Sequence, residues 1–266
     1  MTTSTLTNWR LLGASVTGTS HTKSGLPCQD AHAYCEVAGC ALIAVADGAG
    51  SAERSAEGAQ RASQAALAAM AAALSGGWPA TPEPWRDVFA AAYAAAKSEL
   101  EQLASAAGRP SRAFATTLLC AGISDQGLAV AQLGDGVAAA FAPTGGANAA
   151  GDWFLAAQPQ RGEYANETYF LSQDDALQHL EVAVYAEPVR ALALMTDGLL
   201  RLVLNGQRQP HVPFFEPLLA FGVEVDDAAQ GNGQLAAFLA SERVCARTDD
   251  DKTVVLALRL PPGFRA

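Results

Sequence analysis

The sequence contains no cysteine pair, no excess of basic residues and no long apolar run, and each absence excludes a class of protein. None of its five cysteines stands in a CxxC spacing, which favours reduced thiols over a disulfide framework. Lys and Arg number 17 against 27 Asp and Glu, for a formal net charge of −10, so nucleic acid is repelled. The alanine-rich stretch near residues 67–74 is too short to span a bilayer. We therefore expect a cytoplasmic protein with no membrane or nucleic-acid partner.

The chain has 266 residues, half of them hydrophobic, and this is enough for a sizeable core. The bulk numbers allow one domain or two small ones. No basic-then-apolar signal segment opens the chain, and no internal repeat divides it. The domain boundaries we expect are a polar, threonine-rich tail at 1–8, a folded unit over 9–260 and a short tail at 261–266.

Hydrophobic periodicity and turn residues predict strands that come in hairpin-like groups and helices that come in pairs. In the second predicted helix, the apolar residues Trp85, Phe89, Ala92, Ala96, Leu100 and Leu103 recur every three or four positions. Predicted strands cover residues 9–17, 31–36, 40–46, 115–123, 128–133, 137–142, 181–185, 190–196 and 253–260. Predicted helices cover 53–74, 85–106, 214–221 and 228–240, with a short one after Asp197. Residues 18–29 read as a polar loop, and residues 143–175 as a long, polar, glycine-rich loop with some ordered pieces. This pattern favours an α+β fold with antiparallel sheets covered by helices.

Four aspartates stand against the edges of strand-like apolar runs, and three of them adjoin a glycine. They are Asp47 in ALIAVADGAGS, Asp135 in LAVAQLGDGVAAAF, Asp197 in LALMTDGLL and Asp250 in RTDDDKTVVLAL. In an antiparallel sheet the end of one strand adjoins the start of its neighbour, so all four can share one rim. Clustered carboxylates repel one another unless a cation lies between them. No histidine or cysteine adjoins these acids, which favours Mg²⁺ or Mn²⁺ over Zn²⁺ or Cu²⁺.

At these motifs the chain resembles the metal-dependent protein serine/threonine phosphatases, the protein phosphatase 2C family. The segment GTSHTKSGLPCQDAH resembles the first family motif, which ends in a Glu-Asp or Gln-Asp pair, here Gln29-Asp30. VADGAGS, QLGDG, LMTDGL and DDKTVV resemble the later motifs in the same order. The segment GEYANETYFL is closest to a bacterial branch of the family.

The resemblance implies a four-layer α-β-β-α sandwich, with two antiparallel sheets between helices and two metal ions at the sheet edge. It implies hydrolysis of phosphoserine and phosphothreonine by a metal-bridging hydroxide that attacks phosphorus in line, with no phosphoenzyme intermediate. The implied cofactors are two Mn²⁺ or Mg²⁺ ions, and a third is left open because Arg201, four residues after Asp197, cannot ligate a cation. The implied partners are phosphoprotein substrates and a cognate serine/threonine kinase, and we expect a monomer. Residues 143–175 fall where the family has a variable flap.

The same resemblance assigns the site residues. Catalytic roles fall to Asp47, Asp30 and His21, and phosphate binding to His21 and Lys23. The metal-site residues are Asp47, Gly48 through its carbonyl, Asp197, Asp250, Asp30 and Asp135.

Three positions depart from the family pattern. Ala49 stands where many eukaryotic members have a histidine proposed as general acid, so the leaving group must be protonated by water or another group. Gly25 stands where the first motif often has an arginine, which leaves phosphate contact to His21, to Lys23 or to neither. Gln29 replaces a carboxylate, so the outer shell of one metal loses a charge.

Two other functions remain open at this level. A non-catalytic relative could bind phosphoproteins without hydrolysing them, although all four core acids are present. A two-metal hydrolase could instead act on a small phosphoester, and neither the acidic charge nor the lack of a nucleotide-binding glycine loop decides against it.

Overall fold

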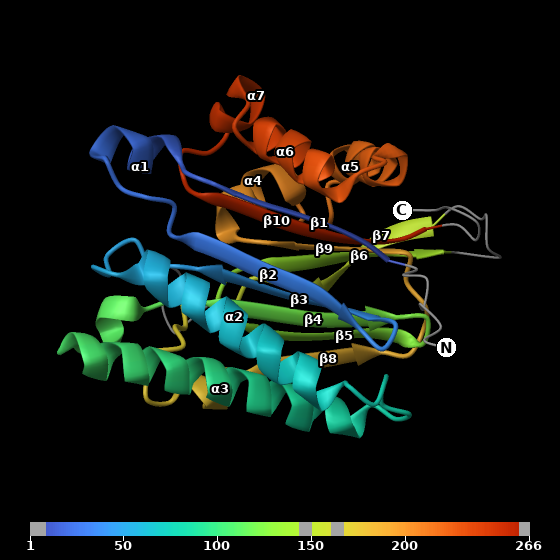
Figure 1. The fold of residues 1–266 in the computed structure, drawn as a ribbon. Helices are drawn as coiled ribbons and strands as arrows, with labels where there is room; N and C mark the ends of the chain where they lie inside the picture. The colour runs from blue at the N-terminus through green and yellow to red at the C-terminus, as the bar shows by residue number, and fades with distance from the viewer. Residues whose placement is uncertain (1–8, 144–150, 161–167, 261–266) are drawn as a thin grey trace.

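A computed structural model describes residues 9–143, 151–160 and 168–260 of the chain. The expected tails, 1–8 and 261–266, lie outside the described residues, as do 144–150 and 161–167 of the expected flap. Two five-stranded sheets stack face to face, and a layer of helices covers each outer face, as Figure 1 shows. Every strand pair is antiparallel. The predicted α+β fold and its four-layer sandwich are therefore confirmed.

The first sheet, here called sheet A, joins strands from both ends of the chain. Its spatial order is β1 (Trp9–Val16), β10 (Lys252–Arg259), β9 (Ala191–Met195), β6 (Val137–Pro143) and β7 (Gly151–Ala157). The second sheet, sheet B, is formed by β2 (Asp30–Val37), β3 (Cys40–Asp47), β4 (Leu118–Ser124), β5 (Gly127–Leu133) and β8 (Glu181–Tyr185), in that order.

Helices fill the two outer layers and short turns link them to the sheets. The long helices α2 (Ser55–Ala73) and α3 (Glu83–Ala107) cover sheet B, whereas α4 (Leu200–Val203), α5 (Val212–Glu224) and α6 (Ala228–Leu239) cover sheet A. The remaining helices are α1 (Thr19–Ser24), α7 (Glu242–Cys245) and the 3-10 turns η1 (Ser111–Phe114), η2 (Ala176–His179) and η3 (Asp197–Leu199). Among the described residues, none of the helices has both the length and the apolar character needed to cross a membrane.

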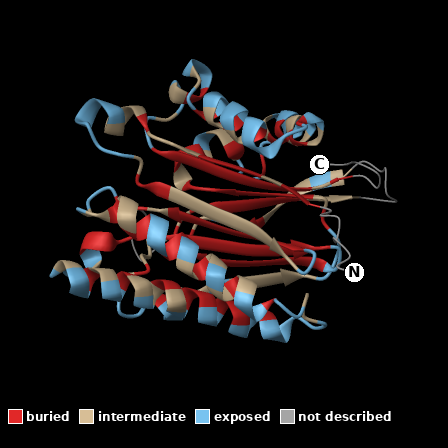
Figure 2. Ribbon diagram, viewed as in Figure 1, coloured by how far each residue is buried: buried red, intermediate tan, exposed pale blue. Residues whose placement is uncertain are grey.

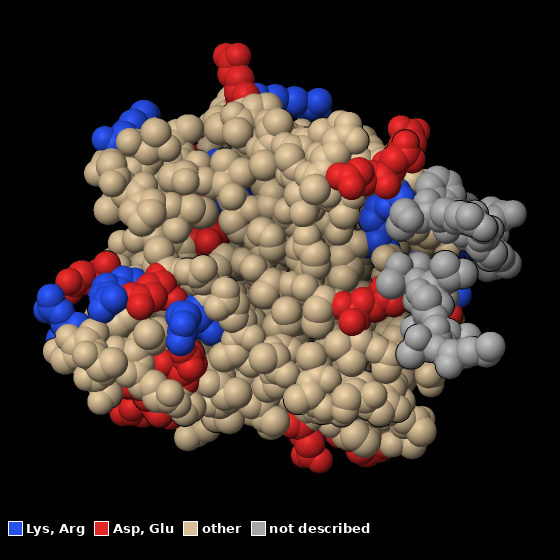
Figure 3. All heavy atoms as spheres, viewed as in Figure 1, with Lys and Arg blue, Asp and Glu red and all other residues tan. Residues whose placement is uncertain are grey.

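The central strands are buried on both faces, which explains their continuous apolar runs. In β3, Leu42, Ala44 and Ala46 pack toward α2 and α3. The alternate residues of the same strand, Ala41, Ile43 and Val45, pack against sheet A. Figure 2 shows the central strands of this interior in red and the edge strands β2 and β8 largely in tan, with exposed residues on the outer sides of the covering helices. The charged side chains in the same view lie mainly at the edge of the molecule (Figure 3).

Helix α3 packs closely on sheet B because its contact face is built from small residues and a few aromatics. Trp85, Phe89 and Leu100 of α3 are fully buried, as the predicted stripe requires, and Leu103 at its end is half-buried. The Trp85 ring occupies the space above Gly122 of β4, where an added Cβ would lie 2.4 Å from the ring. Gly108 ends α3 in the left-handed conformation at φ 61°.

The structure corrects the loop prediction at residues 18–29 and shows an ordered piece within residues 143–175, as expected. Residues 18–29 contain helix α1, which begins after Gly18 and ends at Gly25 with φ 70°. Residues 143–175 contain strand β7, which pairs with β6 at the edge of sheet A. Helix α1 is short and polar, so its sequence TSHTKS carries little periodicity. All five cysteines are free, and two of them, Cys40 and Cys120, are buried.

Candidate metal and phosphate site

The predicted aspartates meet at one rim because strand ends from both sheets meet there. In sheet B, Asp47 ends β3 and pairs directly with Asp30 at the start of β2. In sheet A, Met195 at the end of β9 pairs with both Val254 of β10 and Val137 of β6. Asp197 therefore leaves β9 beside the segments that carry Asp250 into β10 and Asp135 into β6.

These residues enclose a pocket of 170 Å³ between the two sheets. Asp47, Asp135, Asp197 and Asp250 all line it, together with Asp251. No lysine or arginine is among the described residues that line it, and His21 is its one basic group there. A phosphate group could not be held by such a surface without added positive charge.

Two of the Asp-Gly pairs require their glycine, because the backbone of another segment lies directly against it. A Cβ at Gly198 would lie 1.9 Å from the carbonyl oxygen of Asp251, and one at Gly48 would lie 2.6 Å from that of Gln29. Any side chain at either position would push the two motifs apart. The glycines thus let the acid-bearing segments of different strands touch.

Threonines next to neighbouring strands hold the Asp30 carboxyl group and the Asp47 backbone. Thr196 donates a hydrogen bond from Oγ1 to Asp30 Oδ2 at 2.7 Å. The backbone N–H of Asp47 donates to Thr117 Oγ1 at 3.1 Å, and Thr116 Oγ1 donates to the Asp47 carbonyl at 2.9 Å. These bonds fix the positions of the acids without neutralising them.

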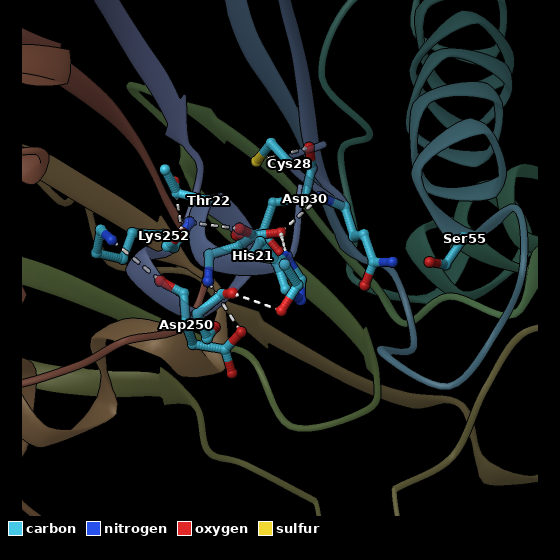
Figure 4. A network of polar contacts seen from close by, with 12 residues as sticks. His21, Thr22, Cys28, Asp30, Ser55, Asp250 and Lys252 are labelled. Atoms are coloured by element: carbon cyan, nitrogen blue, oxygen red, sulfur yellow. Dashed lines mark hydrogen bonds and ion pairs between the residues drawn. The ribbon is translucent and has the colours of Figure 1, made fainter. Parts of the chain in front are cut away.

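Asp251 has a bracing role that the sequence did not indicate. Its carboxylate accepts hydrogen bonds from the backbone N–H groups of Gly18 at 2.6 Å and Gln29 at 2.5 Å, and it contacts His21 Nδ1 at 2.9 Å. Figure 4 shows this network joining the first motif to the segment before β10. The only available signal was the run of three aspartates, and no pattern in it separates the brace from its neighbours.

The His21 contact also determines which ring nitrogen carries a proton. A carboxylate can only accept, so Nδ1 of His21 must be the donor in its bond to Asp251. Lys23 is different, because it is exposed on α1 and does not line the pocket. Its position gives the predicted phosphate contact no support.

Burial and mutual repulsion shift the acids toward their neutral forms. Desolvation, followed by repulsion from Asp30 and Asp197, raises the pKa of Asp47 well above its ordinary value. Desolvation raises the pKa of Asp30 to about 8, against the hydrogen bonds from Thr196 and Thr253, and raises the pKa of Asp197 to about 6. A bound cation would reverse this, since it favours the ionised carboxylates.

The donor set fits hard divalent cations that keep part of their water. Among the described residues, no three His, Cys, Asp or Glu side chains form a ready-made cage around one point. Mg²⁺ sites commonly use only one or two carboxylates per ion, with water and substrate as the remaining ligands. The Oε1 atom of Gln29 is buried without a hydrogen-bond partner in the described part of the chain, and Gln29 lines this pocket. An ion or its water would give that oxygen a partner.

Residues 17–240 match the family model described as Protein phosphatase 2C. This chain belongs to the protein phosphatase 2C family. It is a serine/threonine protein phosphatase by that membership. The similarity extends to "Serine/threonine-protein phosphatase 3" of Escherichia coli (strain K12), which is 37% identical over 94% of this chain and 98% of its own length.

Solved structures share the protein phosphatase 2C fold at lower identity. The S. agalactiae serine/threonine phosphatase matches with a TM-score of 0.61 and 15% identity, over 94% of this chain and 99% of that one. The serine-threonine phosphatase 2C from Toxoplasma gondii matches with a TM-score of 0.64 and 14% identity, over 94% of each chain. At such identities these structures support the fold alone.

Proposed function

We propose that the protein hydrolyses phosphoserine and phosphothreonine in proteins, with two Mn²⁺ or Mg²⁺ ions bound at the rim between the sheets. The observation that carries this proposal is the pocket lined by five aspartates and no lysine or arginine among the described residues. Asp47, Asp197 and Asp250 would hold the ions with the Gly48 carbonyl, and Asp135 would serve an outer or third position. When bound, the ions would supply an activated water and neutralise charge on the phosphoryl group.

The chain's own residues would position the reacting groups. Asp30 lies behind Asp47 and receives the Thr196 hydroxyl, so it can orient water or ligand at the bridging acid. His21 would contact the phosphoryl or leaving-group oxygen through its second ring nitrogen, because Asp251 occupies the first. This role matters since Ala49 offers no side-chain proton.

Hydrolysis of p-nitrophenyl phosphate and of a phosphothreonine peptide tests the proposal. We expect activity with Mn²⁺, and its loss with EDTA and in Asp47→Asn. Metal-independent hydrolysis, or an Asp47→Asn enzyme as fast as the parent, would overturn it. Hydrolysis of the small ester but of no phosphopeptide or phosphoprotein would favour a small-phosphoester hydrolase, and metal binding without any hydrolysis would favour a non-catalytic binding protein.

A further inference from the structure

A second hollow lies on the outer side of sheet A, among α4, α5, α6 and α7. It has a volume of 390 Å³, which is within the usual range for a binding pocket. Arg201, Arg243, Arg247 and His211 line it, and no carboxylate is among the described residues that do so. Figure 3 shows basic side-chain atoms exposed at the top of the molecule, where Figure 1 places α7. The charge of this hollow is opposite to that of the protein as a whole.

The three arginines of this hollow have no ion-pair partner in the described part of the chain. Arg54, Arg61, Arg109 and Arg259 each pair with a carboxylate, whereas Arg86, Arg112 and Arg190 also have no ion pair in the described part of the chain, so what distinguishes the hollow is that three such arginines line it together. Three unpaired guanidinium groups around one hollow create a local positive potential. Guanidinium groups bind carboxylates and phosphates in a planar, two-bond geometry, so the ligand they select is an anion.

An apolar groove continues from the arginine hollow along α5 and α6. This second hollow has a volume of 360 Å³ and shares the wall of Phe214, Pro217 and Phe238 with the first. Its other described lining is almost wholly apolar and includes Phe221 and Leu235. Phe238 is 37% exposed although it is a large apolar side chain. A ligand that covered both hollows would need an anionic part and an apolar part side by side, which a peptide segment provides more readily than a simple anion.

The arginine hollow is tied to the metal site by very short stretches of chain. Arg201 stands in α4, four residues after Asp197, and Arg247 stands three residues before Asp250. Three extended residues span at most about 11 Å. A segment held by these arginines could therefore belong to the same polypeptide as a phosphoresidue in the acidic pocket.

We propose that this groove binds an acidic segment with an adjacent aromatic or large aliphatic side chain, located near the phosphoresidue of a phosphoprotein substrate. That the bound segment belongs to a substrate rests on the proposed function, but binding of the segment to the groove does not depend on catalysis. The arginines contact the acidic side chains, and the apolar residue packs against Phe238. The groove thereby adds affinity for protein substrates that a small phosphoester cannot use.

Direct binding tests the groove without any hydrolysis. The probe is a fluorescein-labelled, unphosphorylated peptide of Glu and Asp residues with one Phe and one Leu. Its binding is measured by fluorescence anisotropy. We expect saturable binding that weakens as salt is added, and about tenfold weaker binding in the double variant Arg243→Gln/Arg247→Gln. The matched control is Arg86→Gln/Arg109→Gln, which removes the same charge from the α3 layer and should leave the affinity unchanged. Phe238→Ala should weaken binding of this peptide but not of a peptide in which Phe and Leu are replaced by Ser.

Kinetics then connect the groove to substrate choice. We expect a phosphothreonine peptide that carries the acidic-apolar segment on either side to have a KM about tenfold lower than the same peptide without it. The difference should disappear in Arg243→Gln/Arg247→Gln, whereas hydrolysis of p-nitrophenyl phosphate by that variant should match the parent.

The two proposals fail in different ways. No peptide binding to the parent protein, or equal binding by the groove variant and its control, overturns the groove whether or not the protein is active. Equal binding of a simple anion such as inorganic phosphate, with no gain from Phe and Leu, would also overturn it, as would peptide binding only to a dimer. Absence of hydrolysis with intact peptide binding overturns the proposed function and leaves the groove in place as a binding site for acidic segments.

Discussion

The acidic pocket at the rim of the sheets and the arginine hollow over sheet A carry opposite charge, although each can bind a negatively charged group. At the pocket, the half-buried Asp47 and the buried Asp30 that pairs with it are held by strand pairing and threonine hydroxyls. In the hollow, exposed arginines stand on short helices and the segments around them, without partners among the described residues. The pocket can attract a phosphate only through a cation, whereas the hollow attracts an anion directly.

The difference shows where rigidity is needed. Ions that take part in a reaction must be held to within a fraction of an ångström, and the pocket is built from strand ends that cannot move independently. A docking groove needs only charge and contact area, which exposed side chains on helices can supply. The predictions below change one of these features at a time, beginning with the one that should matter most.

Removing charge from the acidic pocket should affect its members unequally. Asp197→Asn should lower kcat/KM for p-nitrophenyl phosphate by about a thousandfold, because it removes an acid that the proposed function gives to a tightly held ion. Asp135→Asn should lower it by no more than about tenfold, since the proposed function gives Asp135 an outer role and its carboxylate already accepts a hydrogen bond from Thr168. The measurement is steady-state kinetics over a range of Mn²⁺ concentrations.

Equal losses in the two aspartate variants would contradict the ranking of these acids. Circular dichroism and thermal unfolding of each variant serve as the control for folding. Losses that high Mn²⁺ restores would place the defect in metal binding and not in the chemical step.

The single basic group among the described lining of the acidic pocket should matter more than the lysine beside it in the sequence. His21→Gln should lower kcat by about a hundredfold, because glutamine can still donate to Asp251 but cannot transfer a proton. Lys23→Gln is the matched control and should leave kcat unchanged, since Lys23 is exposed and does not line the pocket. If His21→Gln retains the kcat of the parent, His21 only braces the loop.

The pH dependence of the protein's stability should come from the acidic pocket and not from the arginine hollow. Burial raises the pKa of Asp30 from 3.8 to about 8, so at intermediate pH the folded protein without metal holds a proton that the unfolded chain has released. Its stability must therefore fall as pH rises from about 4 to about 8. With Mn²⁺ the trend should weaken or reverse, because metal binding requires ionised carboxylates.

The measurement is the melting temperature in EDTA and in Mn²⁺ across this pH range. Asp30→Asn should flatten the slope in EDTA, because asparagine can still accept the Thr196 hydrogen bond but does not titrate. Arg243→Gln/Arg247→Gln should leave the slope as it is in the parent. A melting temperature in EDTA that rises with pH over this range would contradict the assignment of a neutral Asp30.

The elements with strong periodicity could be predicted from the sequence, and the short polar ones could not. The stripe from Trp85 to Leu100 and the apolar run of β3 each determine their element, since burial on one or both faces is written in the residue pattern. Helix α1 is not predicted, and strand β7 is predicted only as an ordered piece without bounds, because the formation of each depends on neighbours distant in the sequence.

The same division applies to the site. Asp47, Asp197 and Asp250 could be found in the sequence because each stands at the edge of a strand-like apolar run. Asp47 and Asp197 are also followed by a glycine. The role of Asp251 could not be found, because its donors belong to Gly18, His21 and Gln29, more than 200 residues earlier in the chain. The arginine hollow was equally hidden, since its residues come from four helices and the segments beside them, and no spacing connects them.

The sequence by itself determined that apolar strands would end in aspartates, that helices would come in pairs, and that the acids would need a cation. Those properties are local, because they follow from side-chain periodicity and from the repulsion between like charges. Only the tertiary structure decided that Asp30 faces Asp47, that Asp251 ties the first motif to the last, and that the unpaired arginines share one hollow with Phe238. These depend on strand register and helix packing, which join residues that are distant along the chain.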